Sequence, residues 1–153
     1  MEAVILIGIQ GSGKTTFYRE RFFDTHVRLS LDMLKTRPRL RALMAACIAL
    51  EQRFVVDNTN VLRSERREYI DAAKAAGFRV IGYYFRTELR RAIKWNSLRP
   101  GKQAIPVAGL IGTMKRLETP AIEERFDELY EVTVDAENRF VVSPVPRKDP
   151  AGE

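Results

Sequence analysis

The sequence predicts a single α/β domain in which helices cover both faces of a mostly parallel, five-stranded sheet. Three observations support this prediction. Short apolar runs, typical of buried strands, alternate with longer segments whose apolar residues have helical spacing. A glycine-rich loop joins the first apolar run to the first helical segment. The chain of 153 residues is long enough for one good core and too short for two ordinary domains.

The first strand is expected at residues 3–7, a nearly continuous apolar run. Residues 8–15 then read Gly-Ile-Gln-Gly-Ser-Gly-Lys-Thr and fit the phosphate-binding pattern G-x-x-x-x-G-K-[ST], known as the P-loop. A helix is expected from Lys14 onward. This motif needs a strand before it and a helix after it, because the curled loop and the helix N-terminus together direct backbone N–H groups at a phosphate.

The loop has a residue type for each task in nucleotide binding. Lys14 can reach the β- and γ-phosphates, and the Thr15 hydroxyl can ligate Mg²⁺. The alternative is a glycine-rich turn without a ligand, but a chance match in a chain of this length is on the order of one in a hundred. We therefore expect ATP or another nucleoside triphosphate, with Mg²⁺, to contact Gly8, Gln10, Gly11, Ser12, Gly13, Lys14, Thr15 and Thr16.

The remaining elements follow from apolar spacing and from breaker residues. Pro38 fits the first turn of a helix, Ser64 and Thr87 are candidate N-caps, and Pro120 can open a helix that carries many acids. Strands are expected at residues 26–30, 54–57, 78–85 and 130–134, and helices at 38–51, 64–76, 87–98 and 107–118, with a basic loop at 99–106. Residues 136–153 are expected to form a short strand and a loose tail.

In parallel α/β sheets, ligands bind at the carboxyl ends of the strands. Two carboxylates, Asp32 and Asp57, fall at such ends, with Arg86 at another. A phosphoryl-transfer site needs one carboxylate near Mg²⁺ and one near the attacking hydroxyl. Asp57 closes an apolar strand as a metal-binding acid does, and Asp32 is the better candidate for the general base. Either carboxylate can instead cap a helix or turn.

The net charge of +6 is unevenly distributed. Residues 61–102 contain eleven Lys and Arg against four acids, whereas residues 117–137 contain one Arg against eight acids. The basic segment is either a surface for a phosphate-rich partner or a pair of solvated helix faces. Cys47 is the single cysteine, and no stretch approaches the ~18 apolar residues of a membrane span. These features favour a cytoplasmic protein without membrane association.

Several motifs together resemble one family. They are the P-loop, Asp32 after the second strand, Asp57-Asn58-Thr59-Asn60 followed by Arg66-Arg67, and Asn96-Ser97-Leu98-Arg99 running into the basic loop. Over roughly residues 3–135 the chain resembles the P-loop polynucleotide 5′-hydroxyl kinases of the phage and bacterial end-healing type, which are AAA-type P-loop kinases. The resemblance implies a P-loop kinase domain at residues 1–135 that carries a small helical lid at about residues 95–118.

The resemblance also implies roles for individual residues. Asp32 would be the general base on a 5′-hydroxyl of a nucleic-acid end or nucleotide, and Arg99 would close over the ATP phosphates from the lid. Thr15 and Asp57 would hold Mg²⁺. The acceptor would contact Lys35, Asp57, Asn58, Thr59 and Arg66.

Two positions depart from the family. Lys35 stands where phage-type members have an arginine that binds the acceptor's phosphate, and lysine lacks the bidentate fork. Trp95 replaces a second lid arginine, and either stacks on a base or packs in the core. The alternatives to an end kinase are a small-metabolite kinase with the same machinery, and an ATP-binding regulator or ATPase without an organic acceptor. The sequence indicates neither the oligomeric state nor a preference for DNA or RNA.

Overall fold

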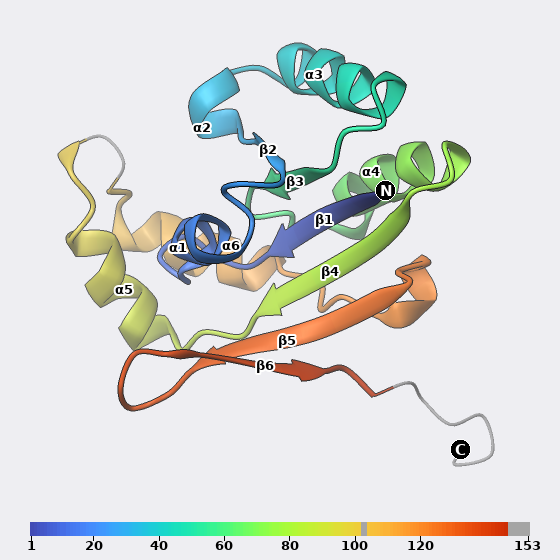
Figure 1. Cartoon of the computed structure of the whole chain (residues 1–153). Coiled ribbons are helices and arrows are strands. Elements are labelled where there is room, and N and C mark those ends of the chain that lie inside the picture. Colours follow the sequence, from blue (N-terminus) through green and yellow to red (C-terminus); the bar gives the residue numbers. More distant parts are fainter. Residues whose placement is uncertain (102–103, 147–153) are drawn as a thin grey trace.

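A computed structural model describes residues 1–101 and 104–146 of the chain. One sheet has the strand order β2-β3-β1-β4-β5-β6, and its first five strands are parallel (Figure 1). The final strand pairs antiparallel with β5 and gives the sheet six strands rather than the expected five. The predicted α/β class is confirmed. The strands are β1 Glu2–Ile7, β2 Val27–Leu29, β3 Phe54–Asp57, β4 Arg79–Phe85, β5 Glu128–Val134 and β6 Phe140–Pro144.

Helices cover both faces of the sheet because side chains along each strand alternate between two apolar clusters. Ala3, Ile5 and Ile7 of β1 pack on the face covered by α3 and α4. Val4 and Leu6 point to the opposite face, which is covered by α1. The helices are α1 Lys14–Arg21, α2 Leu31–Leu34, α3 Arg37–Ala49, α4 Arg63–Ala75, α5 Leu89–Ser97 and α6 Val107–Arg116, and the 3₁₀ turn η2 Ile122–Glu124 follows α6.

The expected helix after Pro120 is wrong, because only the η2 turn forms there. Arg125 ends the turn in the left-handed region, with φ 82°. The next residue, Phe126, is buried in the core, so the chain enters β5 at Glu128. The two expected N-caps are also displaced, since α4 and α5 begin after Leu62 and Glu88.

The turns that follow the parallel strands meet at one edge of the sheet. The backbone N–H of Gly8, after β1, donates to the carbonyl of Thr59, after β3, at 3.0 Å. The Asn60 side chain is buried, and its Nδ2 donates to the Leu6 carbonyl at 2.8 Å. Figure 1 shows α5 and the β5–β6 hairpin beyond the arrowheads of the central strands, at this same edge. The fold therefore gathers the segments that carry the candidate residues.

Within the described ranges, no helix combines the length and the apolar character needed to cross a membrane. The tail beyond residue 146 lies outside the described residues, as do Lys102 and Gln103 of the expected basic loop.

Candidate active site

The P-loop is packed tightly under α5, and two of its glycines are required by that packing. Gly11 and Gly13 have φ of 75° and 93°, a region that residues with a Cβ rarely adopt. A Cβ at Gly11 would lie 2.5 Å from the Ala92 carbonyl oxygen. A Cβ at Gly13 would lie 2.8 Å from Cζ3 of Trp95 and 3.0 Å from Cε1 of Phe140. Trp95 therefore packs directly against the loop.

The Lys14 ammonium lies inside the curve of the loop. Its Nζ donates to the carbonyl oxygens of Gly8 and Ile9, each at 2.8 Å, and to Ser12 Oγ at 3.4 Å. The pKa of Lys14 is lowered to about 8, chiefly by burial and to a smaller extent by Arg99, while the carboxylates of Asp57 and Asp32 act in the opposite direction. A phosphate oxygen in the loop would be a stronger acceptor than these neutral carbonyls, because the hydrogen bond would join two charged groups.

Thr15 and Asp57 contact each other at the start of α1. The Thr15 Oγ1 hydroxyl donates to Asp57 Oδ2 at 3.0 Å, and the Asp57 side chain is only 2% exposed. A hydroxyl and a carboxylate beside a phosphate cradle are the hard oxygen ligands that Mg²⁺ prefers. The donor set fits a nucleotide-bound Mg²⁺.

Arg28 also lies at this site, although no motif in the sequence indicated it. It projects from β2, and its Nε donates to Asp57 Oδ2 at 2.8 Å. The available signal was a lone charge between Val27 and Leu29 in a short strand of a parallel sheet, where both faces are normally apolar.

The candidate base, Asp32, is held near the P-loop by its own short helix. Ser30 caps α2, and its Oγ accepts from the Asp32 backbone N–H at 3.2 Å. The Asp32 side chain is 76% exposed, and its Oδ2 lies 3.6 Å from Nη2 of Arg99. Asn58 Oδ1 accepts from the Leu31 N–H at 2.9 Å and so ties α2 to the loop after β3. Among the described residues, Asn58 Nδ2 has no hydrogen-bond partner.

These groups line one open cavity of about 920 Å³. Of the residues predicted from the sequence, the cavity brings together Gln10, Gly11, Ser12, Gly13, Lys14, Thr15, Thr16, Asp32, Asp57, Asn58, Thr59 and Arg99. Arg19, Arg28, Trp95, Asn138 and Phe140 also line it. Gly8 and Lys35 do not line the cavity. Gly8 lies at the base of the loop, and the exposed Lys35 ends α2 with φ 74°.

Arg66 does not reach this cavity, contrary to the expected acceptor contact. Its guanidinium is fully buried, and Nε and Nη2 donate to the two carboxylate oxygens of Glu124 at 2.8 and 3.0 Å. The third nitrogen, Nη1, donates to the Asn60 carbonyl at 2.9 Å. Arg66 therefore anchors the end of the 57–60 loop from behind, and the structure does not support its contact with an acceptor.

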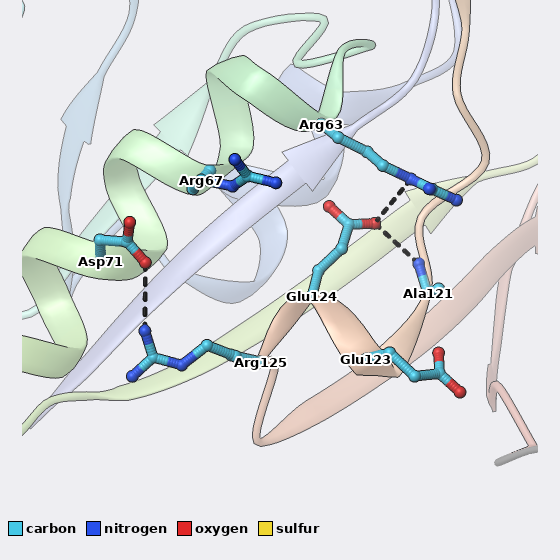
Figure 2. A pocket seen from close by; sticks show the side chains of 7 residues that line it. All are labelled: Arg63, Arg67, Asp71, Ala121, Glu123, Glu124 and Arg125. Carbon is cyan, nitrogen blue, oxygen red and sulfur yellow. Dashed lines mark hydrogen bonds and ion pairs between the residues drawn. The ribbon is translucent and has the colours of Figure 1, made fainter.

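A second cavity, of about 490 Å³, lies between α4 and η2 and shares no residue with the P-loop cavity. Figure 2 shows acidic and basic side chains around it, some of which pair with one another. Asp71 pairs with Arg125 at 3.2 Å, and Arg63 lies 4.0 Å from Glu124. Because these opposite charges neutralise each other, we assign no chemistry to this cavity.

The sheet order, the glycine loop after β1 and the Lys14–Thr15–Asp57 arrangement define a P-loop NTPase of the kinase type. Residues 4–120 match the AAA domain family, and the chain belongs to that family.

One curated relative is the bifunctional polynucleotide phosphatase/kinase of Schizosaccharomyces pombe, which is 27% identical over 135 residues, or 86% of this chain. The chain spans only 33% of that relative's length. Two solved structures share the fold at low sequence identity. Kti12 of Chaetomium thermophilum, in complex with ADP-AlF3, is 17% identical with a TM-score of 0.66, over 89% of this chain and 92% of that one. A gluconokinase of Sinorhizobium meliloti is 18% identical with a TM-score of 0.61, over 86% and 82% of the two chains.

Proposed function

We propose that this protein is an ATP-dependent phosphotransferase that moves the γ-phosphate to a 5′-hydroxyl of a nucleic-acid end or nucleotide. The observation that carries the proposal is the position of Asp32. Its exposed carboxylate opens into the cavity that also contains the P-loop, so a proton acceptor faces the place where a γ-phosphate would lie. The name of the S. pombe relative supports a polynucleotide acceptor, and the ADP-AlF3 bound to Kti12 supports a nucleotide at the P-loop.

The residues of this chain divide the work as follows. Lys14 and the N–H groups at the start of α1 bind the β- and γ-phosphates. Thr15 and Asp57 would hold Mg²⁺, which would neutralise phosphate charge. Arg99 leaves Asp32 for the phosphates, where its planar fork stabilises the transferring group.

The reaction then requires one proton transfer. Asp32, once released by Arg99, accepts the proton of the acceptor hydroxyl while that oxygen bonds to the γ-phosphorus. The bond from the γ-phosphorus to the β–γ bridging oxygen breaks, and ADP leaves with that oxygen. Asp32 later returns the proton to water.

Basic side chains at the cavity and on α5 outnumber the lining acids Glu20, Asp32 and Asp57, and this supports a polyanionic acceptor. Arg19 and Arg99 line the cavity, and Arg90 and Lys94 are exposed on α5, which also contributes Trp95 to the lining. Lys35 is exposed three residues beyond Asp32 and is a further phosphate contact in this proposal. Lys and Arg contacts with phosphate dominate nucleic-acid affinity and make it strongly salt-dependent.

The test is transfer of label from γ-labelled ATP, with Mg²⁺, to a panel of acceptors: 5′-hydroxyl DNA, 5′-hydroxyl RNA, a nucleoside 3′-monophosphate, and a pool of sugars and nucleosides. We expect label on oligonucleotide ends, reduced by added salt, and absent with Lys14→Ala or Asp32→Asn. Label on a small molecule alone would overturn the end-kinase assignment in favour of a metabolite kinase. Bound ATP with no labelled acceptor would favour a regulator or ATPase.

A further inference from the structure

Arg28 contacts both groups assigned to the metal. Its Nε donates to Asp57 Oδ2 at 2.8 Å, and its Nη2 lies 3.4 Å from Thr15 Oγ1. The same two oxygens contact each other at 3.0 Å. One guanidinium therefore bridges the hydroxyl and the carboxylate, and no proton-bearing group other than Thr15 and Arg28 is within hydrogen-bond distance of Asp57 Oδ2 in the described part of the chain.

At this contact the positive charge of Arg28 balances the negative charge of Asp57. The Asp57 carboxylate is almost completely buried, and the Arg28 side chain is 22% exposed. A buried carboxylate needs a counter-charge, and Arg28 supplies one without any metal. In residues 1–101 and 104–146, no three acidic, histidine or cysteine side chains cluster to hold a metal ion, so Asp57 is not part of a larger acidic cluster. Taken together, Arg28, Thr15 and Asp57 carry no net negative charge that would attract a divalent cation.

We propose that Arg28 is a built-in counter-ion that keeps divalent cations out of the Thr15–Asp57 site until the phosphates of a nucleotide bring one in. This inference rests on the proposed function, because it takes Thr15 and Asp57 as the metal-holding residues. A guanidinium and a divalent cation compete for the same oxygens and repel each other at this distance. Metal binding then depends on the additional negative charge of the phosphates.

Arg28 has space to release Asp57. It lines the same cavity as Lys14 and Asp32, so its guanidinium can turn from Asp57 into the cavity without unfolding β2. The exchange makes metal and nucleotide bind cooperatively: each is weakened by the absence of the other. The competing interpretation is a purely structural ion pair between β2 and β3, which would leave metal affinity unaffected by substitution of Arg28.

The test uses Mn²⁺ as the probe, with the full chain and no nucleotide, and free Mn²⁺ measured by electron paramagnetic resonance. We expect no saturable binding to the wild type up to millimolar Mn²⁺. For Arg28→Gln we expect saturable binding with a Kd at least tenfold below the highest Mn²⁺ concentration used. Arg19→Gln is the matched control, since it removes one positive charge from the same cavity without touching Asp57. It should behave as wild type, and Arg28→Gln combined with Asp57→Asn should lose the gained binding.

Unchanged affinity in Arg28→Gln, or an equal gain in Arg19→Gln, would overturn the proposal. A comparison without any Arg28 variant is also decisive: Mn²⁺ binding to the nucleotide-free wild type that disappears in Asp57→Asn would overturn the proposal even if Arg28→Gln does not fold. The proposed function fails by a different measurement. A protein that binds no nucleotide with Mg²⁺ present, or labels no acceptor, refutes the kinase assignment, whereas the Mn²⁺ titration of nucleotide-free protein tests Arg28 separately.

Discussion

Replacing Arg66 by methionine should strongly destabilise the protein, although Arg66 itself does not line the P-loop cavity. The substitution removes three hydrogen bonds at 2.8, 3.0 and 2.9 Å and leaves the Glu124 carboxylate, which is 13% exposed, without its main counter-charge. Removing one partner of a buried ion pair costs about 3–5 kcal/mol. At about 2–4 °C per kcal/mol for a domain of this size, the melting temperature should fall by about 6–20 °C.

The neighbouring Arg67 provides the matched control. It is exposed at the rim of the second cavity (Figure 2), so Arg67→Met should change the unfolding free energy by no more than about 0.5 kcal/mol. Both variants would be compared by urea denaturation followed by circular dichroism. In the double variant Arg66→Met/Glu124→Gln, the loss should be smaller than in Arg66→Met alone, because the introduced amide leaves no buried charge and its oxygen can still accept from the Ala121 N–H.

Equal stability of Arg66→Met and Arg67→Met would refute this reasoning. If the Arg66 variant kept wild-type stability and instead raised the KM for the acceptor, the role first expected from the sequence would be restored.

Three further predictions concern the P-loop cavity. Because burial lowers the pKa of Lys14 to about 8, and phosphates bind its protonated form, nucleotide affinity should fall by up to about tenfold per pH unit above that pH and stay level below it, as measured by calorimetry; the residual affinity of Lys14→Arg should not change across this window. Gly77 has a left-handed φ, but a Cβ there would meet open space. Gly77→Ala should therefore lower the unfolding free energy by only about 1–2 kcal/mol, as measured by urea denaturation. Gly11→Ala should cost more, since its Cβ meets the Ala92 carbonyl at 2.5 Å, and equal losses would contradict the packing argument. Asp32→Asn should retain nucleotide binding while turnover falls by about 10²–10⁴-fold; parallel loss of both would exclude a general base.

The sequence predicted those features that depend on local pattern. Apolar runs such as residues 3–7 and 54–57 marked buried strands, and the motif spacing placed Lys14 and Thr15 at the start of a helix. The rule that ligands bind at the carboxyl ends of strands was enough to expect Asp32 and Asp57 near the P-loop, and the structure places both in its cavity.

Features that depend on long-range partners were missed. An arginine in a basic helix resembles a ligand contact, and only the fold shows that Arg66 meets Glu124, 58 residues away, in the interior. The helix expected after Pro120 does not continue beyond the η2 turn, because Phe126 is buried in the core. Likewise, the function of Arg28 depends on Asp57, which becomes its neighbour only when β2 pairs with β3.

The contact between the P-loop and the last strand has a consequence for how this protein matures on the ribosome. Phe140 of β6 packs 5.3 Å from Phe17 of α1 between ring centroids, and its edge covers Gly13. The motif is synthesised well before this wall of its cavity, because Phe140 follows Gly13 by most of the domain. We expect a nascent chain that ends before residue 140 to contain the complete phosphate-binding motif and still lack a finished nucleotide site, so that ligand can stabilise the domain only after β6 has been synthesised.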